Sequence, residues 1–346
     1  MLKTTRMPRV DGVMLSSKAF TAIITHGDLD GLASAAIVVA HLMHINPHLK
    51  YRVYFSQPFS LHLTLSRVDL QALQKLYILD IAVDVEHWIT VSQVLSELSK
   101  RLEVVWVDHH PSTISKRADL EAIGVKVTAE QAPATATLLR EMVNETEDPV
   151  FYEKLVRLAE ISDAPAAPDD AELASAVEVL SGSLALEPQD EDFKRLLIGY
   201  WVKKRVLVPE EAVERFEAAE EKARRLYEEA TNRVVYDSPL LRVIDLRETR
   251  VYGFAGRIAS HQAKVEGKIV LLMFRIGSDS VVITGRAPEE ASVDLLEVFA
   301  KVAREWGGSG GGHPHAASIR LPAGLADKVL DRIISELEAS LSKRAL

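Results

Sequence analysis

Short apolar runs alternate with amphipathic segments through the first half of the chain. The runs have the length of buried strands, and the segments between them repeat apolar residues at helical spacing. The expected strands cover residues 20–25, 51–55, 76–80, 104–107 and 125–128, and the expected helices cover residues 32–43, 85–100, 135–144 and 149–160. This alternation is typical of a mostly parallel sheet with helices on both faces, so we predict a doubly wound α/β domain.

The second half of the chain predicts another, smaller α/β domain. Its expected strands are residues 241–245, 269–276, 281–285 and 317–321, and its expected helices are residues 253–264, 293–305 and the final segment. Between the halves, residues 181–190 have the composition of a helix-breaking segment, and residues 209–233 form a charged helix typical of a solvated connector. The predicted parts are a tail (1–18), a metal-binding domain (19–190), a helical linker (191–235) and a substrate-binding domain (236–346).

Acidic residues follow three of the expected strands in the first domain. The run at residues 104–107 leads directly into Asp108, His109 and His110, and the other two runs lead to Asp28 with Asp30 and to Asp80. In a parallel sheet these strand ends open on one edge, where the carboxylates repel one another unless cations neutralise them. A strand-end aspartate can also cap the next helix, and a histidine can be satisfied in a turn.

Composition narrows the choice of metal and of cellular compartment. The chain has 346 residues, of which 47% are hydrophobic and 26% charged, as in an ordinary globular protein. It has no cysteine, so a metal would be held by carboxylates and histidines, which favours Mn²⁺ or Mg²⁺ over structural zinc. No apolar run approaches the ~20 residues that span a bilayer, and no signal-peptide core is seen. We therefore expect a cytoplasmic protein without a membrane partner.

Charge is distributed unevenly along the chain. The net charge of −9 disfavours a protein that coats duplex DNA. Residues 141–230 hold 23 acidic and 11 basic residues, whereas residues 240–286 hold 8 basic and 4 acidic residues. The basic stretch suits a local anionic ligand, although solvated arginines would give the same count.

Five glycines occur in the six positions from 307 to 312, and His313 follows them. Glycine lets backbone N–H groups approach an anion closely, so this segment is a candidate phosphate-binding loop. A merely flexible loop is the alternative.

Taken together, these motifs resemble the DHH phosphoesterase superfamily with its associated C-terminal domain. The segments that carry the resemblance are His26-Gly27-Asp28-Leu29-Asp30-Gly31, Asp80, Asp108-His109-His110, Asp163 and Gly310-Gly311-Gly312-His313-Pro314-His315-Ala316-Ala317-Ser318. The first of them is closer to RecJ-like nucleases, especially archaeal ones, than to nano-RNA hydrolases, which tend to have asparagine and proline after the histidine. The departure leaves the role of His26 open.

The resemblance implies two Mn²⁺ ions, with Mg²⁺ as an alternative, in a cleft between the two domains. The implied metal ligands are His26, Asp28, Asp30, Asp80, His109 and Asp163, with Asp80 bridging the ions. Asp108 and His110 are implied to face the substrate or to support the ligands. Arg286, Gly311, Gly312 and His313 are implied to hold a substrate phosphate.

The activity implied is hydrolysis of short single-stranded RNA or DNA from one end. A phosphodiesterase for cyclic dinucleotides and a nucleotide 3′-phosphatase are the alternatives, because the same clamp could hold a small nucleotide. A non-catalytic replication scaffold related to RecJ is a further alternative. Monomer and homodimer both stay open.

Overall fold

The computed structural model describes residues 19–163, 170–288 and 290–344, so the predicted tail at residues 1–18 lies outside it. The chain forms two compact units, which are described separately. Unit 1 comprises Met1–Ala174 and Glu191–Leu207, and unit 2 comprises Ser175–Asp190 and Val208–Leu346.

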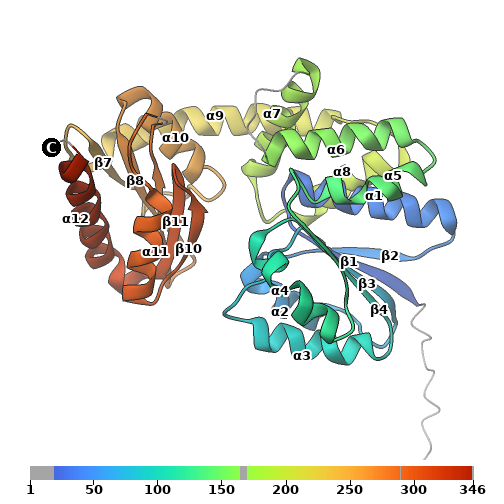
Figure 1. Ribbon diagram of the computed structural model, residues 1–346. Helices are drawn as coiled ribbons and strands as arrows, with labels where there is room; N and C mark the ends of the chain where they lie inside the picture. The colour runs from blue at the N-terminus through green and yellow to red at the C-terminus, as the bar shows by residue number, and fades with distance from the viewer. Residues whose placement is uncertain (1–18, 164–169, 289, 345–346) are drawn as a thin grey trace, which may run out of the picture. The chain divides into compact units, whose positions relative to one another are not determined.

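Unit 1 is built on a five-stranded parallel sheet with the order β2-β1-β3-β4-β5 (Figure 1). The strands are β1 (Phe20–Thr25), β2 (Tyr51–Phe55), β3 (Leu73–Leu79), β4 (Glu103–Asp108) and β5 (Lys126–Ala129). The strand order reverses between β1 and β3, and such a reversal opens a crevice at the carboxyl ends of the two strands. The predicted doubly wound α/β fold is confirmed.

Helices cover both faces of this sheet. They are α1 (Leu29–Ile45), η1 (Pro58–Ser60), α2 (Leu61–Arg67), α3 (Trp88–Ser99), α4 (Pro111–Ala122), η2 (Ala136–Leu139), α5 (Arg140–Asn144), α6 (Pro149–Asp163) and α8 (Glu191–Lys203). Helix α1 packs against α6 and α8 on one face, and its small residues Ala33, Ala35 and Ala36 are fully buried there. On the other face, Leu61 of α2 and Leu95 of α3 pack into the apolar core of the sheet. Burial on both faces explains why the strands are continuous apolar runs.

The expected helix breaker at residues 181–190 was wrong, because α7 (Ala171–Leu186) continues through most of it. Gly182 lies inside this helix, and a Cβ atom there would collide with the ring of Phe216 on α9 (Glu210–Asn232). The hydroxyl of Ser183 donates to the carbonyl of Leu180. The glycine and serine therefore permit close helix packing, and do not end the helix.

The division into units also differs from the predicted domain boundaries. The predicted linker at residues 191–235 contains α8, which belongs to unit 1, and α9, which belongs to unit 2. The chain crosses between the units three times, after Ala174, after Asp190 and after Leu207. The amphipathic α8 buries Leu197 and Ile198 in unit 1, which accounts for its place in that unit.

Unit 2 is built on a six-stranded mixed sheet with the order β10-β11-β9-β8-β7-β6. The strands are β6 (Val234–Asp237), β7 (Leu241–Asp245), β8 (Ile269–Ile276), β9 (Ser280–Arg286), β10 (Ser309–His313) and β11 (Ala316–Pro322). The remaining helices are α10 (Ala255–Glu266), α11 (Leu295–Trp306), η3 (Ala323–Leu325) and α12 (Ala326–Arg344). One face of the sheet is covered by α11 and α12, and the other by α9 and α10. The predicted second α/β domain is confirmed.

The glycine-rich segment is a strand, and the expectation of a loop was wrong. Residues Ser309–His313 form β10, the edge strand that pairs antiparallel with β11. Gly312 has a φ of 137°, and a Cβ atom there would collide with the carbonyl oxygen of Ala316. Glycine is therefore required for the close approach of the two backbones.

Among the helices of the described residues, none has both the length and the apolar character needed to cross a membrane.

Candidate metal centre

The carboxyl end of β1 delivers the first acidic side chain. Asp28 is the N-cap of α1, and its Oδ1 accepts a 3.1 Å hydrogen bond from the backbone N–H of Gly31. Its Oδ2 lies 2.6 Å from Nδ1 of His26. Nε2 of His26 lies 3.2 Å from Oε1 of Gln57, which follows β2. Asp28 thus caps the helix with one oxygen and keeps the other beside His26.

Asp80 follows β3 and has a backbone conformation that residues other than glycine rarely adopt. Its φ is 56°, in the left-handed region, and it is 2% exposed. Strain of this kind is retained where the surrounding structure requires one side-chain direction. Oδ2 of Asp80 lies 3.9 Å from Nδ1 of His26, and Oδ1 lies 3.7 Å from Nε2 of His109. The two carboxylate oxygens of Asp80 therefore face histidines that follow two different strands, His26 after β1 and His109 after β4.

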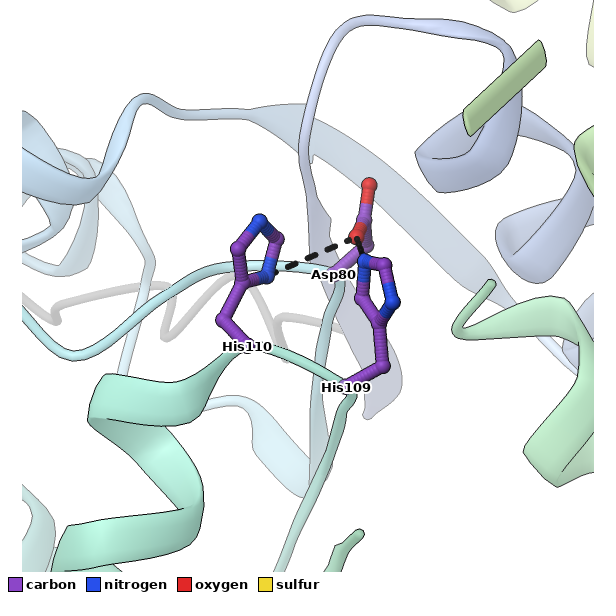
Figure 2. A group of neighbouring side chains, drawn as sticks. All are labelled: Asp80, His109 and His110. Carbon is purple, nitrogen blue, oxygen red and sulfur yellow. Dashed lines mark ion pairs between the residues drawn. The ribbon is translucent and has the colours of Figure 1, made fainter. Parts of the chain in front are cut away.

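His109 follows β4 and points its Nε2 into the acidic cluster (Figure 2). Its Nδ1 lies 3.1 Å from the carbonyl oxygen of Ala132, so the proton of the neutral ring belongs on Nδ1. Nε2 lies 3.4 Å from Asp163, 3.7 Å from Asp80 and 3.9 Å from Asp30. Among the described residues, this buried Nε2 has no hydrogen-bond partner.

His110 and Asp108 form a pair beside His109. Nδ1 of His110 lies 2.7 Å from Oδ1 of Asp108. The same nitrogen lies 4.0 Å from Oδ1 of Asp80 (Figure 2). Asp108 is fully buried, whereas the His110 side chain is 41% exposed. Asp108 thus holds one ring nitrogen of a histidine whose ring reaches solvent.

The amino end of η2 holds Asp30, and sequence reasoning missed this contribution. The backbone N–H groups of Thr135 and Ala136 donate hydrogen bonds of 2.6 and 2.9 Å to Asp30. The hydroxyl of Thr135 donates a 3.0 Å hydrogen bond to Oδ1 of Asp80. A threonine directly at the start of an expected helix was the available signal, because that position leaves backbone N–H groups free.

Unit 2 places the predicted phosphate-binding residues at one end of its sheet. Ala316 of β11 stands opposite Arg286 on one side and opposite His313 on the other, which separates those two by about 10 Å. Nη1 of Arg286 donates to the Thr284 hydroxyl at 3.0 Å and to the Gly285 carbonyl at 2.8 Å. No acidic side chain in the described part of the chain pairs with this guanidinium.

The glycines of β10 differ in how much room they leave for a side chain. A side chain at Gly311 would meet open space, whereas one at Gly312 would collide with β11. His313 is exposed at the end of the edge strand. Arg286, which has no acidic partner among the described residues, and the edge strand β10, two strands away in the sheet, can together bind an anion.

Comparison with known families assigns both units. Residues 21–179 match the model of the DHH family, N-terminal domain, and residues 247–343 match the model of the DHHA1 domain. The chain belongs to the DHH superfamily. A comparison with curated protein sequences gives no match.

Solved structures of DHH proteins share the fold at low sequence identity. A DHH domain described as a member of a family of ribosomal proteins has a TM-score of 0.65 and 17% identity, over 92% of this chain and 86% of that one. RecJ from Thermus thermophilus, solved with Mn²⁺, has a TM-score of 0.61 and 16% identity, over 92% of this chain and 52% of RecJ. The pGpG-specific phosphodiesterase PggH from Vibrio cholerae has a TM-score of 0.52 and 15% identity, over 92% and 99%. The chain spans about half of that RecJ.

Burial and mutual repulsion shift the titration of the DHH carboxylates. Burial raises the pKa of Asp80 well above its ordinary value, and the charges of Asp30, Asp28 and other neighbouring aspartates raise it further. Burial and the charge of Asp163 raise the pKa of Asp30 to about 6. Without a bound cation, Asp80 and Asp30 therefore stay protonated at pH values at which isolated carboxyl groups are ionised.

The neighbouring carboxylates also raise the pKa values of the two histidines at the cluster, which favours the positively charged form of each ring. Asp163 is the main cause that raises the pKa of His109 to about 9. Burial acts to lower the pKa of His26, but the charge and hydrogen bond of Asp28 outweigh it and raise the pKa to about 9. Burial acts to raise the pKa of Asp28, yet His26 brings it below its ordinary value. Positive charge is thus drawn into the cluster.

These residues suit a divalent cation. Ligand atoms within 4.8 Å of one another occur in three overlapping groups: His26 with Asp28 and Asp80, Asp30 with His109 and Asp163, and Asp80 with His109 and His110. The unpartnered Nε2 of His109 and the crowded carboxylates are what a bound cation would satisfy. All six predicted ligands lie in these groups, and the set of oxygens and imidazoles without sulfur matches Mn²⁺ or Mg²⁺.

Proposed function

We propose that this DHH protein is a Mn²⁺-dependent phosphodiesterase that hydrolyses short single-stranded oligonucleotides from one end. The observation that carries the proposal is the placement of Asp80, whose Oδ2 faces His26 and whose Oδ1 faces His109. A carboxylate held in this way would help to hold two divalent cations, the pair that phosphodiester hydrolysis commonly uses.

The overlapping groups suggest how two cations would be shared out. His26, Asp28 and Asp80 would hold one, and Asp30, Asp80, His109 and Asp163 would hold the other. Bound divalent cations supply positive charge that activates water near neutral pH and offsets the charge that builds up on phosphate oxygens. The mixture of imidazoles with carboxylates favours Mn²⁺ over Mg²⁺, which prefers oxygen ligands alone.

His110 is the residue we assign to proton transfer. The buried Asp108 accepts the Nδ1 proton of His110 at 2.7 Å and so orients the ring. The opposite nitrogen can then donate its proton to the oxygen that leaves the phosphorus atom. This role needs a ring that the substrate can reach, and His110 is the more exposed of the two histidines.

Arg286, Gly311, Gly312 and His313 would hold a phosphate that is not cleaved. Arg286 offers donors without an acidic partner among the described residues, and the edge strand β10 offers backbone N–H groups beside open space at Gly311. A clamp that grips one phosphate at a fixed place favours substrates presented by their end.

Small nucleotides are the rival substrates. The similarity to a pGpG-specific phosphodiesterase over 99% of that chain supports a substrate of two nucleotides, and the same clamp would suit a cyclic dinucleotide or a nucleotide 3′-phosphate. The net charge of −9 favours short strands over long ones in every case.

Product analysis tests the proposal. RNA and DNA oligomers from dinucleotide to eicosamer, labelled at the 5′ or the 3′ end, are incubated with Mn²⁺, with Mg²⁺ or with excess chelator. We expect mononucleotides released from one end, activity with Mn²⁺ that chelator abolishes, and rates that fall for the longest oligomers. A cyclic dinucleotide or a 3′-phosphonucleotide cleaved much faster than any oligomer would replace the proposed substrate. Absence of hydrolysis with all substrates and metals would favour the scaffold role.

A further inference from the structure

A buried lysine lies beside the acidic cluster of unit 1. Lys194 of α8 is 6% exposed. Its Nζ lies 2.4 Å from the point at which Gly27 would carry a Cβ atom if it had a side chain. Lysine is almost never fully buried unless opposite charge compensates it. The neighbouring aspartates are a source of such charge, so the lysine and a bound cation would compete for the same carboxylates.

The packing of α8 places this ammonium group on one side of the cluster. Helix α8 packs against α1 and beside β2. Nζ of Lys194 lies over the ring of Phe55, the last residue of β2, at 5.3 Å from the ring centre. Gly27 follows β1, and its sequence neighbours are His26 and Asp28. The ammonium group therefore lies at the carboxyl ends of β1 and β2.

The ligand groups of the metal centre lie at different strand ends. The His26 group consists of His26, Asp28 and Asp80, and the His109 group consists of Asp30, His109 and Asp163. His26 and Asp28 flank Gly27, whereas His109 follows β4, which lies two strands from β1 in the sheet. Two strand spacings amount to about 10 Å. The charge of Lys194 is thus on the side of the His26 group and away from His109.

A positive charge in this position opposes the binding of another one. Like charges repel, and the repulsion is stronger at a buried site because little water and salt screen it. The charge of Lys194 does reach His26, since burial and this charge both act to lower the pKa of His26, although Asp28 outweighs them. A divalent cation carries twice the charge of a proton, so Lys194 would repel it more strongly.

Two other roles for this lysine fit the structure less well. A lysine that binds a substrate phosphate has to expose its ammonium group, and Lys194 is buried. A lysine that only fills space buries its aliphatic stem and keeps the charged end in water. In this protein the charged end itself lies beside Gly27. The fold therefore specifies the position of the charge, and not only that of the stem.

We propose that Lys194 makes the two cation sites unequal by weakening the site at the His26 group, so that the His109 group is occupied first. The inference rests on the proposed function, because it takes each group to hold a divalent cation. The Mn²⁺ concentration at which the second site fills is then set by a residue of α8 that is not itself a ligand.

Neutral variants test the effect of the charge. Lys194→Met keeps an unbranched side chain, and Lys194→Gln keeps a polar end, so that one replaces the other if either fails to fold. Calorimetric titration of the metal-free full chain with Mn²⁺ should resolve two unequal sites in the wild type. In both variants the weaker site should bind at least about tenfold more tightly, and the affinity of the stronger site should change by less than about threefold.

A matched control comes from the same helix. Lys203→Met removes an exposed positive charge at the end of α8 and should leave both affinities within about twofold of wild type. The direction of the change separates charge from packing, because a variant that merely disturbs the segment around Gly27 would bind Mn²⁺ more weakly. The rise in Tm at a fixed Mn²⁺ concentration should accordingly be larger in both Lys194 variants than in the wild type.

Asp28→Asn identifies the weaker site, and asparagine can still cap α1. This variant should lose the weaker binding event and keep the stronger one, and the reverse result would overturn the proposal. Equal affinities in the wild type, or a weaker site that is not strengthened in either Lys194 variant, would also overturn it and leave the proposed function in place. Two unequal sites that respond as expected, without hydrolysis of any oligomer, would refute the proposed function alone.

Discussion

The hydroxyl of Thr135 donates a 3.0 Å hydrogen bond to Oδ1 of Asp80, the carboxylate that stands between the two ligand groups. The backbone N–H of the same threonine donates to Asp30 at 2.6 Å. One residue at the start of η2 therefore orients a carboxylate in each group, although it contributes no ligand of its own.

Thr135→Val should lower the affinity for Mn²⁺ about tenfold to a hundredfold, as loss of a hydrogen bond to a ligand typically does. Valine has the shape of threonine and keeps the backbone donor, so only the hydrogen bond to Asp80 is lost. Thr135→Ser keeps the hydroxyl and serves as the control. Calorimetric titration of the metal-free protein measures both, and equal affinities for valine and serine would show that this hydrogen bond is irrelevant.

Asp80→Asn should abolish binding of both cations and not of one. The amide cannot supply a negative oxygen to each ligand group, and the two cations repel each other without it. Elemental analysis after dialysis against Mn²⁺ gives the stoichiometry, with the exposed Asp119→Asn as the control. Two ions per chain in the Asp80 variant would contradict the shared-carboxylate interpretation.

Stability of the metal-free protein should fall as pH rises. The pKa of Asp30 is raised to about 6, so its protonated form stabilises the fold at low pH and this contribution is lost between about pH 4 and 6. The pKa of His109 is raised to about 9, so its contribution is full below about pH 6.5 and is lost towards pH 9.

Mn²⁺ competes with these protons, so its stabilising effect should grow over the same pH ranges. Thermal unfolding at pH 6, 7 and 8 with and without Mn²⁺ measures the effect. Asp163→Asn removes the main cause of the raised His109 pKa and should flatten the upper range in the metal-free protein. A shift in Tm on adding Mn²⁺ that is equal at all three pH values would count against the cluster as the binding site.

Arg286→Gln should weaken substrate binding and leave both metals in place. Loss of a charge-assisted hydrogen bond costs about 2 kcal/mol, which corresponds to a factor of about 30 in KM or in kcat/KM. Arg275→Gln on β8 is the control, because that arginine pairs with Glu248 and is exposed. His313→Ala should act in the same direction. Wild-type kinetics for both variants on short oligomers would assign this end of the unit 2 sheet another role.

Much of the fold and most of the candidate ligands followed from local pattern. Strands such as β1 and β4 are buried on both faces and therefore read as unbroken apolar runs, and the residues after them must lie at one edge of a parallel sheet. Asp28, Asp80 and His109 could be placed there without coordinates for that reason. The register of apolar positions also predicted strands β8, β9 and β11 of unit 2.

Contacts between distant segments decided the rest. Gly182 packs against Phe216, Gly312 against Ala316, and Lys194 fills the space beside Gly27, so each glycine has its reason in a residue elsewhere in the chain. The same holds for Thr135, which lies 55 positions from the carboxylate it orients.

The left-handed backbone of Asp80 and the strand formed by Ser309–His313 belong to this second class. Local propensity disfavours both a non-glycine residue at positive φ and a strand rich in glycine. Side-chain packing and strand pairing in the surrounding sheet override those local preferences. These interactions form only when segments that are distant in the sequence meet, so the local sequence pattern cannot predict them.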